Sequence, residues 1–551
     1  MDHTDRLRLA YTEMLLRSYN KKIEQHEDVI AGFAGKLRNP RESQEATLRS
    51  ILDRNAETDY GRRYQFSEIA NSDDYRRRVP IVRYEDLQPY VTRARAGEPD
   101  VLTRGVASYF SVTSGSTADP KFIPGNQQTI TVGCDAILVR NSYLRRDHPR
   151  AFDGTPLFIV GNANEGKTSA GIGYGAMTGF GYHVGHVGFA APRLPYELFT
   201  IADHRARYYA ILRIALAQSD LSAIFVYNPS TLLLLLERAT EWWDKLITDI
   251  RNGTIAVELS GETSVALEPW LTANPARADA LLNVRDDGPR AWWPSLALLV
   301  CWKGGALGYY LSELESWIGD LPVRDLGVVA SEAVLTIGVD DQTAGGVLLP
   351  ESAFFEFVPV DGEHTTLCAW ELCEGKSYRV IVTTFGGLYR YELGDVVRVE
   401  RMLHATPLLS FLHRAGRVHS FTGEKLTELH VTEAVRIASD RAALRLRGFT
   451  AVPVWDRPPR YDVLVEPVEE IENDECDRLA QFIDEAMATV NIEYASKRAS
   501  MRLGRTRVVI VEHGTYEHLR RARSAQDAQY KEIHLAIESG FAAALIAGGA
   551  A

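Results

Sequence analysis

Short apolar runs alternate with amphipathic segments between residues 106 and 399, and this alternation limits the possible folds more than any other feature. The apolar runs predict strands at Val106–Val112, Pro156–Val160, Leu221–Tyr227, Leu296–Trp302, Val323–Val329, Phe354–Val358 and Tyr378–Thr384. The segments between them predict helices at Gln127–Arg146, Arg205–Ala217, Ser230–Arg251 and Tyr309–Ile318. Strands that alternate with helices indicate a layered α/β domain. The turn at Gly386-Gly387 favours some antiparallel pairing, so we expect mixed sheets.

The pattern changes beyond His413, after a short basic segment that we interpret as a hinge, His413-Arg414-Ala415-Gly416-Arg417. The following residues predict helices at Leu426–Leu446, Glu469–Val490 and Thr515–Arg523, and strands at Gly448–Trp455, Tyr461–Val465 and Thr506–Glu512. A unit of this length and pattern is typical of a compact α+β domain. We therefore expect a large N-terminal α/β domain over residues 1–412 and a smaller α+β domain over residues 413–551.

The overall charge and the cysteines narrow the class of protein. A net charge of −12 at pH 7 argues against nucleic acid or an anionic membrane surface as the main partner. The five cysteines lie singly along the chain, which favours reduced thiols and a cytoplasmic location. The charged N-terminus has no apolar region behind it, and the longest apolar run, Leu232–Leu236, is too short to cross a bilayer. We therefore expect neither a signal peptide nor a membrane partner.

A hydroxyl-rich loop follows the first of the predicted strands and reads Thr113-Ser114-Gly115-Ser116-Thr117, with Pro120-Lys121 after it. The glycine lets the backbone approach a ligand closely, and the hydroxyls and neighbouring amides can hold anionic oxygens. Lys121 can add a positive charge on a mobile stem. The loop therefore predicts a phosphate-binding turn.

A second segment competes with this interpretation. Residues Gly161-Asn162-Ala163-Asn164-Glu165-Gly166-Lys167-Thr168 match the phosphate-loop pattern of nucleotide triphosphatases letter for letter. Such a loop requires a helix directly after Lys167-Thr168, because the helix N-terminus faces the phosphate. The glycines between residues 171 and 181 oppose a helix there. We favour a flexible loop with a chance match over a nucleotidase or switch protein that uses Lys167.

Three further segments place small or acidic residues directly after predicted strands. Gly304-Gly305-Ala306 leaves room for a flat ring such as adenine, although an ordinary turn has the same pattern. Glu332 ends the run Val328–Glu332 and suits a magnesium ion that bridges phosphates, although it could also cap a helix or pair with an arginine. Asp395 follows a glycine turn, and its carboxylate could accept hydrogen bonds from ribose hydroxyls or only stabilise the turn.

The order of these segments resembles the plant auxin-responsive acyl acid amido synthetases and their bacterial relatives, which belong to the acyl-adenylate-forming superfamily. The resemblance extends from Val79 to Lys531 and rests on Val79–Leu87, Trp242, Asp249-Ile250, Gly253, Ala330-Ser331-Glu332, Arg390-Tyr391, Gly394-Asp395, Gly423–Glu428, Gly514–Glu517 and Gln529-Tyr530-Lys531. There are also departures. Val328, Val329 and Ala330 stand where the plant family has Tyr-Ala-Ser, so the aromatic residue that faces adenine is absent.

The resemblance implies two half-reactions that use ATP and Mg²⁺. A carboxylic acid is first joined to AMP with loss of pyrophosphate, and an amine, usually an amino acid, then displaces the AMP. By the same resemblance, the N-terminal domain carries most of the nucleotide and acyl site, and the C-terminal domain moves between the two steps. The implied catalytic residues are Ser114, Glu332 (the metal ligand) and Lys531. The implied nucleotide-binding residues are Ser114, Gly115, Ser116, Thr117, Gly305, Ala306, Ala330, Ser331, Glu332, Asp395, Arg414 and Arg417.

The acid-binding residues are harder to predict. The stretch Gly171–Phe189 combines small and aromatic residues, as binding slots do, and offers Tyr174, Phe180, Tyr182 and His183. A glycine-rich core loop is an equal interpretation. Three other functions stay open: a thiol such as coenzyme A or an unusual amine as the acceptor, a phosphate-loop nucleotidase, and a nucleotide-binding relative without catalysis.

Overall fold

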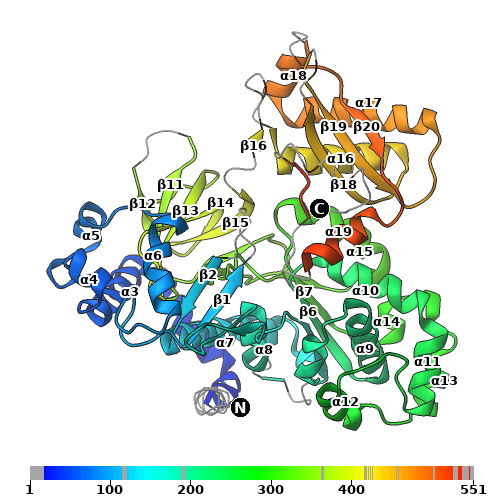
Figure 1. The fold of residues 1–551 in the computed structure, drawn as a ribbon, viewed down its shortest axis with the longest axis horizontal. Helices are drawn as coiled ribbons and strands as arrows, with labels where there is room; N and C mark the ends of the chain where they lie inside the picture. The colour runs from blue at the N-terminus through cyan, green and yellow to red at the C-terminus, as the bar shows by residue number, and fades with distance from the viewer. Residues whose placement is uncertain are drawn as a thin grey trace. The chain divides into compact units, whose positions relative to one another are not determined.

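The computed structural model describes residues 18–113, 121–185, 188–189, 194–361, 365–414, 418–419, 421, 424, 426–454, 456, 458–499, 503–524, 532–536, 541 and 545. The chain divides into two compact units (Figure 1). The larger unit holds the residues up to Gly304 together with Tyr310–Leu393 and Val397–Phe411. The smaller unit holds Gly305–Tyr309, Gly394–Val396 and the residues from Leu412 onward. The roles expected for residues 1–412 and 413–551 stay predictions.

A four-stranded parallel sheet forms one core of the larger unit, in the order β3-β6-β7-β8. Its strands are β3 (Thr155–Ile159), β6 (Leu221–Val226), β7 (Leu298–Cys301) and β8 (Val323–Asp325). Every residue of β6 and β7 is buried, as expected for apolar strands covered on both faces. Figure 1 shows α9 (His204–Ala217) and α10 (Pro229–Glu241) beside β6 and β7, and α11 (Trp243–Asn252) further from the sheet.

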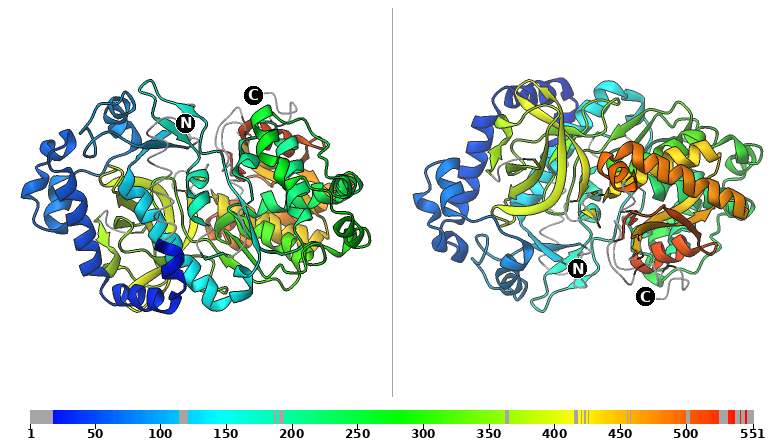
Figure 2. Two further views of the ribbon diagram at one scale, coloured as in Figure 1. Left: turned by 90° about the horizontal axis from the view of Figure 1, so that it is seen from below. Right: turned by 90° about the horizontal axis from the view of Figure 1, so that it is seen from above.

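A seven-stranded sheet forms the second core, in the order β12-β11-β13-β14-β15-β10-β9. Its strands are β9 (Thr336–Ile337), β10 (Gly346–Leu348), β11 (Phe354–Pro359), β12 (Leu367–Cys368), β13 (Ser377–Thr383), β14 (Tyr391–Leu403) and β15 (Thr406–Arg414). Strand β11 is antiparallel to β12 and β13, and β10 is antiparallel to β9 and β15. Figure 2 shows these strands curving beside the N-terminal helices, where Leu48, Ile51 and Leu52 join the same core.

A smaller mixed sheet has the order β2-β1-β5-β4. Its strands are β1 (Tyr109–Thr113), β2 (Lys121–Gly125), β4 (Gly166–Lys167) and β5 (Gly173–Gly175). Strand β1 is antiparallel to β2 and parallel to β5. The larger unit also contains the helices α2 (His26–Arg38), α3 (Pro40–Asn55), α4 (Asp59–Arg63), α5 (Ser72–Arg78), α6 (Tyr84–Arg95), α7 (Gln127–Asp147), α8 (Met177–Gly185), α12 (Gly261–Leu267), α13 (Pro275–Leu281) and α14 (Pro289–Trp292). Helix α15 (Gly308–Ile318) begins in residues of the smaller unit and continues in the larger one.

Local sequence signals explain where several helices begin and end. Helix α7 begins at Gln127 because the Asn126 side chain accepts a hydrogen bond from the Thr129 amide. The single helix predicted at Ser230–Arg251 is wrong, since the chain forms α10 and α11 with a turn at Trp242. The backbone bonds from Trp242 to Arg238 and from Leu246 to Trp242 continue through the turn, so the apolar periodicity is not interrupted.

The smaller unit is built on a three-stranded sheet in the order β18-β19-β20. Its elements are β16 (Val418–His419), β17 (Leu426–Thr427), α16 (Glu428–Ala442), β18 (Leu446–Val454), β19 (Arg460–Pro467), α17 (Asn473–Val490), α18 (Ile492–Ala499), β20 (Arg507–Ile510) and α19 (Thr515–Ser524). Helices α16 and α17 share a core with Val463 and Val465. Leu464 points to the opposite core, which contains Tyr516 of α19. This unit is therefore a sheet with helices on both faces.

The expected fold class is confirmed: the larger unit is a layered α/β domain with mixed sheets, and the smaller is an α+β domain. Apart from the helix predicted at Ser230–Arg251, which forms α10 and α11, the predicted strands and helices form with ends that shift by a few residues. The largest shift among the strands is at Val323–Val329, where β8 already ends at Asp325. Among the described residues, the structure contains no helix with the length and apolar character that crossing a membrane requires.

Candidate active site

The predicted phosphate loop connects two paired strands. Thr113 is the last residue of β1 and lies opposite Lys121, the first residue of β2, in antiparallel register. The Lys121 ammonium lies 5.4 Å from the centroid of the Tyr84 ring. The loop residues Ser114, Gly115, Ser116 and Thr117 lie outside the described residues, so their role stays a prediction. The structure does define β1 and β2, the pair of strands that this loop connects.

Glu332 lies at the tip of a short hairpin that follows β8, which we call the β8 hairpin (Val328–Thr336). An antiparallel bridge joins Val329 to Val334, and the Ala330 amide donates to the Ala333 carbonyl at 2.9 Å. The side chains of Ser331 and Glu332 are each 8% exposed. The Ala330-Ser331-Glu332 motif is thus held in a tight, buried turn at the carboxyl end of a parallel strand, where α/β sheets place their ligands.

The predicted adenine segment follows the neighbouring strand. Residues Trp302–Gly304, which we call the β7 loop, lead from β7 into a short 3-10 helix at Gly305–Leu307. Gly305 has a φ of 63°, a conformation that suits glycine. The side chain of Ala306 is not among those described. The segment leads into α15, so its contact with adenine stays a prediction.

Asp395 lies within β14 and is 7% exposed, directly after Gly394 with its positive φ of 82°. Arg414 is the last residue of β15, and its side chain is not described. Arg417 lies outside the described residues. The ribose and phosphate contacts expected of these three residues stay predictions.

Lys531 also lies outside the described residues, but the segment after it, residues 532–536, is anchored in the smaller unit. Leu535 forms a parallel bridge with Ala451 of β18. The His534 amide donates to Glu428 Oε1 at 2.7 Å, and His534 Nδ1 donates to the Phe449 carbonyl at 3.1 Å. The residues that follow Lys531 are therefore added to the free edge of the sheet beside β18.

The residues expected to bind the acid differ in their contacts and burial. The Tyr174 ring, in β5, lies 5.2 Å from the Phe122 ring, and Phe180, in α8, lies 4.5 Å from Tyr109. Tyr182 is 2% exposed and donates to the Leu194 carbonyl at 2.5 Å. His183 belongs to α8, but its side chain is not described. Their role in acid binding stays a prediction.

Arg140 is a residue that the sequence analysis missed. It lies on α7, is 9% exposed and donates to Asn141 Oδ1 at 3.1 and 2.9 Å. Its guanidinium lies 5.2 Å from the centroid of the Phe225 ring, in β6. Burial lowers the pKa of Arg140 to about 10 and raises the pKa of Tyr227, the residue that follows β6. Of the described carboxylates, none forms an ion pair with Arg140.

This arrangement places a buried positive charge near the carboxyl end of a parallel strand. The Tyr227 ring contacts the Trp302 ring, with centroids 5.2 Å apart, so two aromatic side chains lie at the ends of β6 and β7. A buried cation without an anionic partner is costly. An anionic ligand would supply the missing partner. The sequence signal that could have pointed to Arg140 is a charged residue directly after the apolar helical run Ala136–Val139.

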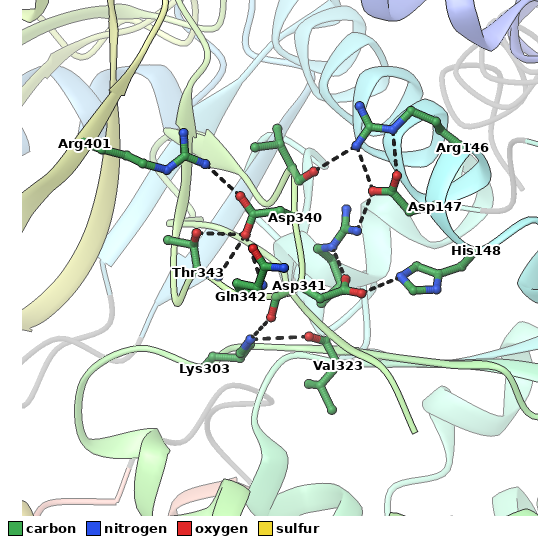
Figure 3. Close-up of polar contacts among 12 residues, drawn as sticks. Arg146, Asp147, His148, Lys303, Val323, Asp340, Asp341, Gln342, Thr343 and Arg401 are labelled. Carbon is green, nitrogen blue, oxygen red and sulfur yellow. Dashed lines mark hydrogen bonds and ion pairs between the residues drawn. The ribbon is translucent and has the colours of Figure 1, made fainter. Parts of the chain in front are cut away.

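A network of charged side chains fastens the loop between β9 and β10 (Figure 3). Arg324, in β8, is 1% exposed and donates to Asp147 at 2.7 Å and to Asp341 at 2.5 Å. His148 Nε2 lies 2.8 Å from the other oxygen of Asp341, and Arg401 donates to Asp340 at 2.8 Å. Burial alone would raise the pKa of Asp341, but its hydrogen bonds lower it to about 2. The Asp341 carboxylate therefore stays charged at neutral pH, and its contacts hold this loop against β8 and α7.

The competing phosphate-loop pattern at Gly161–Thr168 does not lead into a helix. Gly166–Lys167 forms β4, which is antiparallel to β5. The Thr168 carbonyl accepts from the Gly171 amide, and the chain turns directly into β5. As expected, no helix follows Lys167-Thr168 directly, which disfavours a nucleotidase built on Lys167. The expectation that the glycines up to residue 181 oppose a helix is wrong for the last of them, since α8 includes Gly179 and Gly181.

The sequence matches three consecutive domains of one family. These are the GH3 family N-terminal domain over residues 29–323, the GH3 family central domain over residues 346–414 and the GH3 family C-terminal domain over residues 429–539. The chain belongs to the GH3 family, so the family resemblance expected from its motifs is confirmed.

Two named relatives illustrate how much of the chain is shared. The jasmonoyl–L-amino acid synthetase JAR6 of Nicotiana attenuata is 25% identical over 539 residues, covering 92% of both chains. The probable indole-3-acetic acid-amido synthetase GH3.12 of Oryza sativa subsp. japonica is 28% identical over 493 residues, covering 79% of this chain and 78% of the relative. Among solved structures, the AtGH3.15 acyl acid amido synthetase in complex with 2,4-DB has a TM-score of 0.85, 21% identity and 96% coverage of both chains. That likeness establishes the fold.

Proposed function

We propose that this chain is an ATP-dependent, AMP-forming ligase that joins a carboxylic acid to an amine, an amino acid, through an amide bond. The observation that carries the proposal is the alignment with a named amino acid synthetase over 92% of both chains. The buried turn that holds Ser331 and Glu332 and the buried Arg140 support it, because they place a carboxylate and a cation at the same end of one parallel sheet.

The proposed reaction has two steps. A carboxylate oxygen of the acid attacks the α-phosphorus of ATP, the bond to the β-phosphate oxygen breaks, and pyrophosphate leaves. The nitrogen of the amine then attacks the carbonyl carbon of the acyl-adenylate, AMP leaves, and the amine gives up a proton. The first step brings two anions together, so it needs positive charge and hydrogen-bond donors already in place. We propose the Ser114–Thr117 loop and Lys531 for this role, and Asp395 for the ribose.

Glu332 offers a single carboxylate, which fits magnesium that arrives with ATP. Within the described part of the chain, no three His, Cys, Asp or Glu side chains gather into a metal site. Magnesium bound by one carboxylate and by phosphate oxygens needs no such group. We propose Glu332 as that carboxylate, and the ion would neutralise charge on the phosphates.

We propose small-molecule partners alone, an acid and an amino acid, and a cytoplasmic location. The net charge of −12 disfavours nucleic acid and anionic membranes as partners. The cysteines Cys134, Cys301, Cys368, Cys373 and Cys476 are all free thiols, in keeping with a reducing compartment.

The proposed function is tested by acid-dependent exchange of labelled pyrophosphate into ATP, across a broad panel of carboxylic acids. We expect exchange with at least one acid, followed by an amide product in mass spectrometry when amino acids are added. A thioester or another adduct would show a different acceptor. Release of ADP and phosphate, without exchange, would contradict the proposal.

Replacing Arg140 by methionine is expected to raise the KM for the acid by about 10- to 100-fold, because a charge-assisted hydrogen bond to the carboxylate is lost. The midpoint of thermal unfolding should stay the same or rise, since an isolated buried charge is removed. Steady-state exchange kinetics and a thermal melt measure the two effects. Arg145→Met on the same helix is the matched control, and an unchanged KM in Arg140→Met would contradict this role for Arg140.

A further inference from the structure

One buried carboxylate connects the two loops that follow β7 and β8. Asp325 is the last residue of β8, and its side chain is 2% exposed. Its Oδ2 accepts from the Lys303 amide at 2.8 Å, and its Oδ1 accepts from the Gly327 amide at 2.6 Å. Lys303 belongs to the β7 loop, and Gly327 directly precedes the β8 hairpin. Asp325 therefore ties the starts of both loops to one point.

Other contacts hold the same two loops. Trp302 Nε1 donates to the Gly327 carbonyl at 3.0 Å, which is a second bond between the β7 loop and the base of the hairpin. The Lys303 ammonium donates to the Asp341 carbonyl at 2.5 Å and to the Val323 carbonyl at 3.4 Å (Figure 3). The β7 loop is thus fixed through its backbone amide and through the end of the lysine side chain.

The hairpin base has little freedom to move. Gly327 has a φ of 87°, and a Cβ at this position would lie 2.3 Å from the Thr336 carbonyl oxygen. The Thr336 hydroxyl in turn accepts from the Val328 amide at 2.7 Å. The Leu335 amide donates to the Val328 carbonyl at 2.9 Å. A hairpin fixed this closely at its base transmits the position of Asp325 to its tip, where Glu332 lies.

A charged group at this position is costly for the fold. Burial raises the pKa of Asp325 to about 6, against the hydrogen bonds from the Gly327 and Lys303 amides. Of the described cations, none forms an ion pair with its carboxylate. Two amides that point to one spot need an acceptor with two free oxygens, which an ionised carboxylate supplies and a neutral asparagine does not.

We propose that Asp325 is a positioning residue for Glu332 and the β7 loop, and through them for the nucleotide. This inference rests on the proposed function, in which Glu332 meets the phosphates of ATP. Asp325 itself touches neither substrate in this proposal. Its role is to set the distance between two loops, and a displacement of about 1 Å in such a group can cost about 100-fold in rate.

The test compares Asp325→Asn with Glu332→Gln and with the double variant in the pyrophosphate exchange assay. Asp325→Asn keeps one acceptor and turns a donor towards the second amide. We expect the KM for ATP to rise about tenfold, with the KM for the acid unchanged. In the Glu332→Gln background, Asp325→Asn should keep only the part of its effect that acts through the β7 loop, because the position of the missing carboxylate no longer matters. If the double variant shows the full product of the effects of the two single variants, the inference is overturned.

Asp340→Asn is the matched control. The Asp340 carboxylate also accepts from two backbone amides, those of Gln342 at 3.1 Å and Thr343 at 2.9 Å, but in the loop between β9 and β10. We expect its KM for ATP to stay at the parent value. A circular dichroism melt checks that each variant folds. If Asp325→Asn does not fold, Lys303→Met loosens only the β7 loop and should still raise the KM for ATP.

The two proposals fail in different ways. If the parent exchanges pyrophosphate and Glu332→Gln is impaired, while Asp325→Asn and Lys303→Met behave like the parent, the inference is wrong and the proposed function stands. If the parent exchanges with no acid, the proposed function is wrong. Calorimetric titration with MgATP then decides the inference: weaker binding by Asp325→Asn supports it, and equal affinity overturns it.

Discussion

Replacing Arg390 by methionine is expected to lower the free energy of unfolding by about 3–5 kcal/mol, because it leaves a buried carboxylate without its partner. Arg390 is 5% exposed and Glu356 is 1% exposed. The guanidinium donates to both oxygens of Glu356, at 2.9 and 2.8 Å. It also donates to the carbonyls of Arg76 and Val79, each at 2.7 Å. A urea titration followed by circular dichroism measures the loss.

Backbone hydrogen bonds at Arg390 join two family motifs. The Val82 amide donates to the Arg390 carbonyl at 3.0 Å, and the Glu392 amide donates to the Val82 carbonyl at 2.8 Å. The segment that begins at Val79 is therefore joined to the start of β14, which also carries Asp395. We therefore interpret the role of Arg390, within the motif that also contains Asp395, as structural.

Arg62→Met serves as the control for Arg390→Met. Arg62 pairs with Asp59 at 3.0 Å, but its side chain is 58% exposed, so its loss should cost less than about 1 kcal/mol. A loss below 1 kcal/mol for Arg390→Met would mean that Glu356 finds another partner or that solvent reaches it. The double variant Arg390→Met with Glu356→Leu should recover part of the stability, since no charge is then left unpaired.

Replacing Glu332 by glutamine is expected to slow adenylate formation by about 100- to 1,000-fold, the usual effect of removing one charge-stabilising group from an active site. Glutamine keeps the size of the side chain, so the β8 hairpin should keep its structure. The initial rate of pyrophosphate exchange over a range of magnesium concentrations measures the effect, and high magnesium should restore only part of the rate.

An exposed glutamate on α15 provides the comparison. Glu315→Gln removes the same charge from a solvent-exposed position and should leave the exchange rate unchanged. If Glu332→Gln exchanges within twofold of the parent, Glu332 does not hold the metal and another group must neutralise the phosphates.

The sequence predicts the elements of this fold well because most of them are set by local patterns. The apolar run at Leu221–Tyr227 becomes the buried strand β6, and the capping signal at Asn126 starts α7 at the expected residue. Strand β8 was predicted too long for a different reason. Its apolar run continues to Val329, but the Asp325 carboxylate and the positive φ of Gly327 end the strand earlier.

Residues of the candidate site could be predicted from the sequence only where they belong to a recognisable motif. Glu332 and Asp395 were found through their order along the chain. Arg140, Asp325 and Lys303 were not, because their contacts are with partners distant in sequence or depend on where a strand ends, which is set by its pairing. A lone arginine on a helix and a lysine after a strand have many ordinary explanations, and only the structure brings them next to the carboxyl ends of β6, β7 and β8.

The segment after Lys531 also covers an otherwise exposed sheet edge. Strand β18 is at the edge of its sheet, and residues 532–536 cover that edge: Ala536 donates to the Ala451 carbonyl, and the His534 carbonyl accepts from the Ala451 amide, each at 2.9 Å. A chain cut before Glu532 would uncover these backbone groups as a template for strand addition by another molecule. We therefore expect the chain without residues 532–551 to aggregate more readily than the parent.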